Sequence, residues 1–337
     1  MLEARLWQPL NDDRVQCRLC RRMCVIAPGE RGYCGVRENR DGILYSLVYD
    51  RLAALNLDPV EKKPLYHFLP GSQTFSFGTA GCNFSCAFCQ NDSLSQLPRQ
   101  GGTIPGRVAG PAELVDAALR NQATSIAYTY SEPTIYFELM RDTATLAKEQ
   151  GLRNILVSNG YQGPECLEKL GPLIHAANID LKAFTDTFYK DLCGARLAPV
   201  LENLRIMREM GWWLEITTLV IPGWNDEQAE LMSLAGCIAE TLGKDTPWHV
   251  SRFHPQFRLM DTQPTPLPTL ERALRAGHEA GLRYVYIGNV PGHEANHTFC
   301  PGCGERLVER LGFGVRDYRI GDGHCPDCGH PIAGVWN

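Results

Sequence analysis

The sequence of 337 residues lacks any apolar run of about 18 residues, so no membrane-spanning helix is expected. Its start, MLEARLWQPLNDDR, lacks the apolar core of a signal peptide. An excess of basic residues is missing too. The formal net charge is −5, whereas a nucleic-acid-binding protein usually has a basic balance. We therefore expect a cytoplasmic protein without a membrane as partner, and the charge argues against a nucleic acid as partner.

Cysteine, in contrast, is abundant. The chain has 14 cysteines, and a reducing compartment favours metal ligation over disulfide formation. Eleven of them fall into three tight clusters, near residues 17–34, 82–89 and 300–328. The other three, Cys166, Cys193 and Cys237, stand alone and are expected to be small buried hydrophobic residues.

From about residue 75, short β-rich runs alternate with longer helical patterns, which predicts βα units and a parallel sheet. The expected strands are Thr74–Thr79, Ser125–Tyr130, Asn154–Ser158, Asn178–Leu181, Trp213–Ile221, Trp248–Phe253 and Tyr284–Ile287. The predicted class is α/β, as a partial (β/α)6-type TIM-like barrel whose chemistry sits at the carboxyl ends of the strands.

Three segments follow from this pattern. Residues 1–74 form an N-terminal four-cysteine metal-binding segment with a hairpin that turns at Arg40-Asp41-Gly42. Residues 75–296 form the core barrel. Residues 297–337 have few helix signals and four cysteines, and form a zinc-ribbon-like domain.

The central cluster lies in FGTAGCNFSCAFCQN, directly after the first core strand. Cys82, Cys86 and Cys89 have the spacing C-x3-C-x2-C, and a [4Fe–4S] cube normally takes four thiolates. Three thiolates leave one iron open to another ligand, and Phe88 can shield the cluster from water. The alternative is a three-cysteine zinc site completed by a histidine, but zinc knuckles favour C-x2-C pairs and no second pair is nearby.

This loop resembles the signature of the radical S-adenosylmethionine (SAM) superfamily. The resemblance implies that SAM chelates the open iron and that one electron cleaves it to methionine and a 5′-deoxyadenosyl radical, which abstracts hydrogen from a substrate. It also implies an electron donor such as flavodoxin or ferredoxin.

The resemblance extends to polar residues that follow successive strands. Glu132, in TYSEPT, matches the acidic residue that receives the SAM amino group, and Ser158 and Asn159, in VSNG, are expected to reach the ribose. Asp180 and Lys182, in IDLK, resemble the D-L-K stretch of glycyl-radical activating enzymes, whose lysine approaches the SAM carboxylate. A helix-capping acid and an ordinary Asn-Gly turn remain alternatives for the first two motifs.

Two later strand ends fit the same pattern. Pro222 and Gly223, in VIPGWND, resemble the turn that supports the SAM adenine, and His254, in SRFHP, matches a histidine that approaches SAM. A purely structural histidine is the alternative. Val157 stands where activating enzymes can carry an acid of a cation site, so the resemblance does not imply a bound monovalent cation.

Across nearly the whole chain, the sequence resembles the radical SAM member of the AmmeMemoRadiSam system, which is similar to pyruvate formate-lyase activating enzymes. The stretches that carry this are DPVEKKPLYHFLPG, GCNFSCAFCQN, YTYSEPTI, PWHVSRFHP and the terminal CPGCG…GVW. Ser131 departs from an expected Asn. Memo-like and AMMECR-like proteins are the implied partners.

The resemblance does not fix the substrate, which can be a glycine of a partner protein or a small molecule. Modification of RNA or a peptide is a second possibility. A zinc-scaffolded binding module without catalysis is the alternative from another class of protein.

The flanking clusters predict two more metal sites. Cys300, Cys303, Cys325 and Cys328 form two C-P-x-C-G knuckles, which predict a closed structural zinc site, with rubredoxin-type iron as the alternative. The N-terminal set can hold zinc or an auxiliary [4Fe–4S] cluster, and zinc is the preferred interpretation. Its members are Cys17, Cys20, Cys24 and Cys34.

Overall fold

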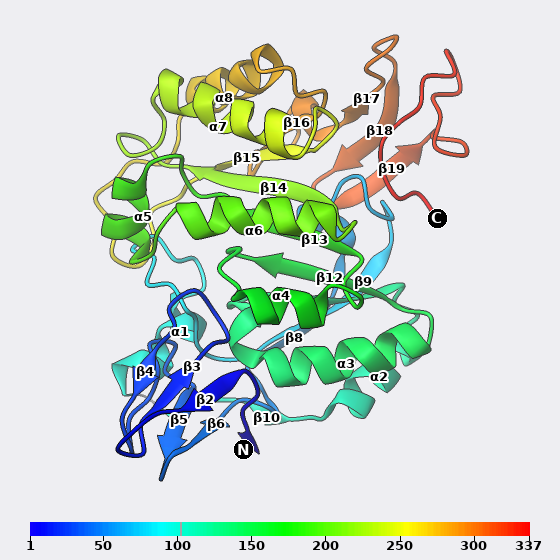
Figure 1. Cartoon of the computed structure of the whole chain (residues 1–337). Coiled ribbons are helices and arrows are strands. Elements are labelled where there is room, and N and C mark those ends of the chain that lie inside the picture. The colour runs from blue at the N-terminus through cyan, green and yellow to red at the C-terminus, as the bar shows by residue number, and fades with distance from the viewer. Residues whose placement is uncertain (102) are drawn as a thin grey trace. The chain divides into compact units, whose positions relative to one another are not determined.

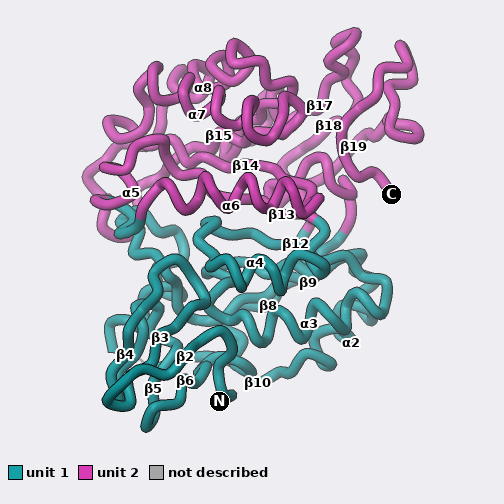
Figure 2. Tube along the Cα trace, viewed as in Figure 1, with its two compact units in different colours: residues 1–58, 73–175, 192–195 teal, residues 59–72, 176–191, 196–337 magenta. Residues whose placement is uncertain are grey.

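A computed structural model describes residues 1–101 and 103–337, and Figure 1 shows the arrangement of its helices and strands. The described chain divides into two compact units, coloured separately in Figure 2. Unit 1 contains residues 1–58, 73–175 and 192–195, and unit 2 contains residues 59–72, 176–191 and 196–337. No helix among the described residues is long and apolar enough to cross a membrane. The division into residues 1–74, 75–296 and 297–337 stays a prediction from the sequence.

Unit 1 is built on a sheet in the order β12-β11-β9-β8. Strands β9, β11 and β12 run parallel, with Ser125 of β11 opposite Thr74 and Arg153. Helices α2 and α3 pack against each other, and α3 also packs on β12. The bounds are β8 (Ala54–Pro59), β9 (Gln73–Gly78), α1 (Asp92–Ser95), α2 (Pro111–Arg120), β11 (Ser125–Tyr128), α3 (Phe137–Glu149), β12 (Arg153–Ser158) and α4 (Pro164–Leu170).

Two small antiparallel sheets come from the N-terminal residues of unit 1, in the orders β1-β6-β5 and β2-β3-β4, and β7 pairs with β10. The hairpin predicted at Asp41-Gly42 is confirmed, because both residues have positive φ and Arg40 pairs with Ile43. The strands are β1 (Leu2–Glu3), β2 (Trp7–Pro9), β3 (Val15–Cys17), β4 (Val25–Ile26), β5 (Arg37–Arg40), β6 (Ile43–Ser46), β7 (Arg51–Leu52) and β10 (Arg107–Val108).

Unit 2 contains four parallel strands in the order β16-β15-β14-β13. Helix α6 packs on β14, α7 packs against α8, and α8 packs on β15 and β16. The bounds are β13 (Ala176–Asp180), α5 (Asp186–Cys193), α6 (Ala198–Glu209), β14 (Trp213–Val220), α7 (Gln228–Thr241), β15 (Trp248–Arg252), α8 (Leu267–Glu279) and β16 (Val285–Gly288).

The last residues of unit 2 form a three-stranded antiparallel sheet of β17 (Thr298–Phe299), β18 (Arg306–Leu311) and β19 (Gly314–Tyr318). Residues 59–72 run beside the end of the chain, because Phe68 forms a parallel bridge with Val335 and Val335 N donates to the His67 carbonyl at 2.8 Å. Leu307 and Tyr286 share one buried cluster with Tyr66. The tail therefore shares a core with β16 and with residues 59–72.

All seven predicted core strands are observed, each within two residues of its predicted ends. Gly151 and Gly211 take positive φ directly after α3 and α6, as expected of residues that end helices. The α/β class with a parallel sheet is confirmed. In neither unit do the described strands close into a ring, which agrees with a partial barrel rather than a full one.

Glu215, near the start of β14, organises the interior of unit 2. Its carboxylate is fully buried and accepts from the backbone N–H groups of Tyr66 and His67 at 2.9 and 2.8 Å. It also contacts Trp213 Nε1 at 3.1 Å and His249 Nε2 at 2.7 Å. These contacts tie residues 59–72 to β14 and β15 near the amino ends of the strands, the end of a βα fold that serves stability rather than chemistry.

His67 extends this network toward the tail. Its Nδ1 lies 2.7 Å from the Ala333 carbonyl and its Nε2 lies 2.6 Å from the Tyr286 hydroxyl, which fits a neutral ring that donates through Nδ1 and accepts through Nε2. Burial lowers the pKa of His67 to about 4, although the nearby Glu215 carboxylate opposes this shift.

A pH dependence of stability follows. Because the folded-state pKa of His67 lies below the unfolded value of about 6.5, the unfolded chain binds a proton first as the pH falls. The free energy of unfolding should therefore decrease by up to about 1.4 kcal/mol per pH unit between pH 6.5 and 4. Denaturant titrations at pH 7 and pH 5 of the wild type and His67→Asn check this. The gap between the two proteins should shrink at pH 5, and a gap that stays constant would contradict the assignment.

Candidate functional site

The central cysteine loop follows β9 in unit 1. Gly81 turns the chain at φ +102°, where a side chain would lie 2.9 Å from the Cys34 carbonyl oxygen. Backbone bonds then fix the loop, because Ser85 N donates to the Cys193 carbonyl at 3.0 Å and Ala87 N donates to the Leu192 carbonyl at 2.8 Å. These two bonds fasten the loop that bears the three cysteines to the backbone of residues 192–193.

The sulfurs of this loop lie in a mostly buried setting. Phe84 N donates to Cys82 Sγ at 3.3 Å, and Cys89 Sγ lies 3.2 Å from the Ser95 hydroxyl. Burial raises the pKa of Cys82 well above its usual value, and the Glu132 carboxylate raises it further. Without a cation the thiol therefore keeps its proton, and a bound metal must displace that proton to gain a thiolate ligand.

Glu132, Ser158 and Asn159 meet at the carboxyl ends of β11 and β12. Glu132 Oε1 accepts from Ser158 Oγ at 2.8 Å and from Thr134 N at 3.0 Å, while Glu132 Oε2 accepts from Asn159 N at 2.9 Å. Burial raises the pKa of Glu132, and these hydrogen bonds oppose the rise. The structure thus brings the three predicted residues together, and their predicted contacts with SAM stay predictions.

Asn83 joins this network to the cysteine loop. Asn159 Nδ2 donates to Asn83 Oδ1 at 2.7 Å, so the loops after β9 and β12 are linked directly. The side-chain amide of Asn83 is buried, yet its Nδ2 has no hydrogen-bond partner among the described residues, and the same holds for the Ser131 hydroxyl. Buried donors of this kind normally have acceptors, so they fit a loop that surrounds a group rich in acceptors, such as a cluster with its sulfides.

The remaining predicted SAM residues lie in unit 2. Lys182 Nζ pairs with Asp180 Oδ2 at 3.0 Å, just after β13, so the two charges compensate each other. Gly223 takes φ +76° in the turn after β14, beside the half-buried Pro222, and His254 is exposed after β15. Asp180 is the last residue of β13, and the other four follow the carboxyl ends of parallel strands, as predicted from the sequence.

Sequence reasoning missed a residue that shapes the turn after β14. Asn225 is buried, and its side chain accepts from Ile221 N at 2.6 Å and donates to the carbonyls of Leu219 at 2.9 Å and Lys182 at 2.7 Å. Asn225 therefore fastens the Pro222-Gly223 turn to the backbone of Lys182. The Asn after Pro-Gly-Trp in the sequence was an available signal, because Asn commonly bonds to nearby backbone in turns.

Four cysteines of the tail converge on one point. Their sulfurs lie within 4.8 Å of one another, with 3.6 Å between Cys300 and Cys328 and 3.7 Å between Cys303 and Cys325. A tetrahedral ion with metal–sulfur bonds of about 2.3 Å requires sulfur–sulfur separations of about 3.8 Å. The arrangement therefore fits a single four-coordinate ion with no open position.

The isolated cysteines show no such convergence. Cys166 and Cys193 are buried, as predicted, while Cys237 is partly exposed and lies 3.7 Å from the Thr241 hydroxyl.

A further motif, H-E-A-N-H at residues 293–297, matches the H-E-x-x-H pattern of zinc proteases. That pattern needs an α-helix, but here the residues form a single 3-10 turn, η4 (Glu294–Asn296). The Nδ1 atoms of His293 and His297 accept from the backbone N–H groups of Ala295 and Arg310, both at 3.1 Å. With both Nδ1 atoms used in this way and no α-helix to align the two rings, these residues do not form the metal site of that pattern.

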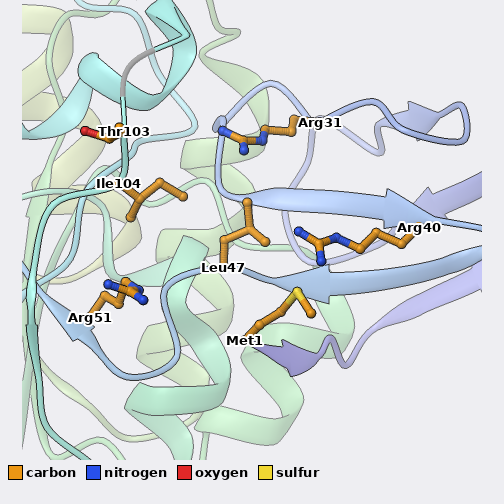
Figure 3. A pocket seen from close by; sticks show the side chains of 7 residues that line it. All are labelled: Met1, Arg31, Arg40, Leu47, Arg51, Thr103 and Ile104. Atoms are coloured by element: carbon orange, nitrogen blue, oxygen red, sulfur yellow. The ribbon is translucent and has the colours of Figure 1, made fainter.

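Two cavities in the described chain lie away from the central cysteine loop and from the predicted SAM residues. The cavity of about 410 Å³ in Figure 3 is lined by Arg31, Arg40 and Arg51, with Leu47 and Ile104 between them. Arg31 and Arg40 both pair with Glu38, at 2.9 and 2.6 Å. A second cavity of about 380 Å³ lies between α8, β16 and the H-E-A-N-H turn.

Comparisons with known proteins agree with this geometry. Residues 77–235 match the model of the radical SAM superfamily. The chain is 44% identical to the uncharacterized protein MJ0808 of Methanocaldococcus jannaschii over 98% of this chain and 99% of that protein. It is 28% identical to the benzylsuccinate synthase activating enzyme of Thauera aromatica over 39% of each chain.

A fold comparison points the same way. The structure of Streptococcus suis SuiB bound to S-adenosylmethionine is similar with a TM-score of 0.51 and 13% identity, over 72% of this chain and 56% of that one. This likeness concerns the fold alone. The family match spans the cysteine loop and the carboxyl ends of β9, β11, β12, β13 and β14, and it implies a [4Fe–4S] cluster and SAM as cofactors. The chain is therefore an enzyme and belongs to the radical SAM superfamily.

Proposed function

We propose that this enzyme reductively cleaves SAM at a [4Fe–4S] cluster held by Cys82, Cys86 and Cys89. The observation that supports this best is the buried loop after β9, whose three cysteines adjoin the network of Glu132 and Asn159. When bound, the cluster would supply the electron that splits SAM into methionine and a 5′-deoxyadenosyl radical. The role of the chain is to hold the loop, to leave one iron without a protein ligand and to exclude water.

The predicted SAM residues have distinct roles in this proposal. Ser158 and Asn159 would contact the ribose, and Lys182 would approach the SAM carboxylate while Asp180 holds it in place. Glu132 receives four hydrogen bonds from Thr134, Ser158 and Asn159, so it would also act by positioning the loops after β11 and β12.

Two further contacts complete the SAM site in this proposal. The Pro222-Gly223 turn, fastened by Asn225, would support the adenine. His254 is exposed and therefore free to approach SAM from the end of β15.

For the substrate, we propose hydrogen abstraction of the glycyl-radical type, from a glycine of a partner protein. The partial similarity to an activating enzyme for benzylsuccinate synthase supports this class. From the resemblance to the AmmeMemoRadiSam system, we propose Memo-like and AMMECR-like proteins as partners. We propose flavodoxin or ferredoxin as the electron donor. A small-molecule substrate is the second candidate.

For the tail, we propose a structural zinc ion at Cys300, Cys303, Cys325 and Cys328. The two knuckles share one backbone pattern, because Gly304 N donates to the Cys300 carbonyl and Gly329 N donates to the Cys325 carbonyl, both at 2.9 Å. The ion would hold the tail in the fold that places Ala333 and Val335 against residues 59–72.

The test is anaerobic. Purified and reconstituted protein should contain about four irons in the central loop. With dithionite and SAM it should release 5′-deoxyadenosine and methionine in equal amounts, measured by liquid chromatography. With a glycyl-radical substrate, an EPR signal should remain on the partner, whereas a small-molecule substrate should leave none. An iron-loaded protein that leaves SAM intact would refute the proposed reaction.

A further inference from the structure

Three arginines line the cavity of Figure 3, which lies in unit 1 and has a volume of about 410 Å³. Arg31 lies between β4 and β5, Arg40 is the last residue of β5, and Arg51 begins β7. Figure 3 shows their guanidinium groups directed toward the space around Leu47 and Ile104. The tertiary structure therefore gathers three arginines that do not belong to one basic run of the sequence.

The register of β5 fixes two of these side chains. Arg31 forms an antiparallel bridge with Glu38, so the two residues lie opposite each other. Glu38 and Arg40 share one face of β5, because they are two residues apart in the strand. The Glu38 carboxylate accepts from the Nε of both arginines, at 2.9 Å from Arg31 and 2.6 Å from Arg40. Glu38 is therefore a positioning residue that holds both arginines at the cavity.

Most N–H groups of these arginines remain available to a ligand. A guanidinium has five N–H groups, and Arg31 and Arg40 each donate only the Nε–H to Glu38. Within the described chain, their Nη atoms form no hydrogen bond, and the side chain of Arg51 forms neither a hydrogen bond nor an ion pair. No acidic side chain is among the described residues that line the cavity. The cavity is therefore rich in donors and poor in acceptors.

The charges around the cavity do not balance. Burial raises the pKa of Glu38, but the hydrogen bonds from Arg31 and Arg40 outweigh this effect and lower the pKa, so the carboxylate stays charged. One carboxylate against three guanidinium groups leaves a net charge of +2. Converging like charges repel one another, and an anion bound between them removes this repulsion. The side chains of Arg31 and Arg40 are 39% and 46% exposed, so an anion can reach them directly from solvent.

A phosphate group matches this arrangement better than a carboxylate. A phosphate monoester carries a charge of about −1.5 to −2 at pH 7 and has three strong acceptor oxygens. One such group can therefore accept from several guanidinium groups at once and compensate the net charge of the cavity. A carboxylate has a single charge and two oxygens, which the paired N–H groups of one guanidinium already satisfy.

The rest of the lining favours an organic phosphate over the free ion. Leu47 is buried and Ile104 is partly buried, so they offer apolar surface between the arginines, and Thr103 adds a hydroxyl. Gly106 lets this segment lie against β7, because a side chain there would lie 2.8 Å from the carbonyl carbon of Arg51. The cavity volume falls within the range of about 300–1,000 Å³ that is typical of small-molecule sites.

We propose that Arg31, Arg40 and Arg51 bind a small organic phosphate. Its phosphate group lies among the three guanidinium groups, and its apolar part covers Leu47 and Ile104. The cavity lies away from the central cysteine loop and from the predicted SAM residues, so it is a second binding site of the protein. Its ligand is recognised without the cluster or SAM.

Isothermal titration calorimetry of the full-length protein at low salt tests this proposal, with phenyl phosphate as the probe. Inorganic phosphate should bind several-fold more weakly than phenyl phosphate, because it has no apolar part to cover Leu47 and Ile104. Benzoate has the same ring with a carboxylate in place of the phosphate group. It should bind about tenfold more weakly than phenyl phosphate.

Three variants locate the bound probe. Arg51→Ala should weaken phenyl phosphate about tenfold, since it removes one guanidinium group and leaves the two bonds to Glu38 in place. Ile104→Ser should weaken phenyl phosphate several-fold and leave inorganic phosphate unchanged. Arg208→Ala is the matched control, because Arg208 lies exposed in α6 of unit 2, and it should bind as the wild type does. Should Arg51→Ala not fold, as judged by circular dichroism, Ile104→Ser still tests the site.

The outcomes separate this proposal from its alternatives. No binding of phenyl phosphate at about 10 mM, or equal binding by Arg51→Ala and the wild type, would overturn the site. Inorganic phosphate that binds as tightly as phenyl phosphate would overturn the organic ligand in favour of the free ion. A hexaglutamate peptide that binds more tightly than phenyl phosphate, and is lost in Arg51→Ala, would overturn it in favour of an acidic protein segment. None of these measurements needs iron or SAM, so they do not depend on whether the proposed reaction occurs.

Discussion

Replacement of Cys86 by alanine should remove the cluster of the central loop and abolish the cleavage of SAM. Cys86 is 8% exposed, and Cys82 and Cys89 cannot hold three irons between them. Iron should fall from about four atoms per chain to nearly none, and release of 5′-deoxyadenosine should fall below detection. Zinc should stay at the wild-type level, because the flanking cysteines are untouched.

Cys237→Ala is the matched control for this result. Cys237 lies in α7, outside the three clusters, and contacts Thr241. Iron content and SAM cleavage in this variant should equal those of the wild type. Retention of iron and activity by Cys86→Ala would show that the central loop is not the catalytic centre, and equal losses in both variants would point to a general effect of removing a thiol.

Replacement of Glu215 by alanine should strongly destabilise the fold. Its carboxylate accepts from two backbone N–H groups, an indole N–H and His249, all buried or half-buried. Each buried donor left without an acceptor costs about 1–3 kcal/mol, so the total loss should reach at least about 4 kcal/mol. That is a large share of the roughly 5–15 kcal/mol by which proteins are stable.

Denaturant titration at pH 7 measures this loss, with Glu240→Ala as control. Glu240 lies exposed in α7, and its removal should change the free energy of unfolding by less than about 0.5 kcal/mol. Glu215→Gln should fall between the two, because an amide oxygen can still accept while the amide nitrogen faces other donors. A loss below about 1 kcal/mol in Glu215→Ala would contradict the central place of Glu215.

The contrast between Cys86 and Glu215 shows which features could be predicted from the sequence. Cys86 belongs to a local pattern, since its partner ligands lie within seven residues of the chain and directly follow a strand. The seven core strands were predictable for a similar reason, because buried parallel strands are short apolar runs between helical patterns. Glu132 and Ser158 were found because motifs at the ends of such strands resemble those of the radical SAM superfamily.

Glu215 and His67, in contrast, act through partners that are distant in the chain. His67 bonds to Ala333 across 266 residues, and Glu215 accepts from Tyr66 across 149. No local pattern in DPVEKKPLYHFLPG indicates that its backbone N–H groups will donate to a carboxylate of β14. The hydrogen bonds from Tyr33 and Arg22 to the central cysteine loop could not be predicted for the same reason. Side chains in irregular segments follow no periodic pattern that would indicate their neighbours.

The most direct test of the open iron is EPR spectroscopy of the reduced wild type, with and without SAM, in a protein whose flanking sites hold zinc. SAM can bind the cluster only if one iron lacks a protein ligand. The signal of the reduced cluster should therefore change its g-values when SAM is added, and Cys86→Ala should show no such signal. A fully loaded [4Fe–4S] cluster whose spectrum is the same with and without SAM would contradict a three-cysteine site with an open iron.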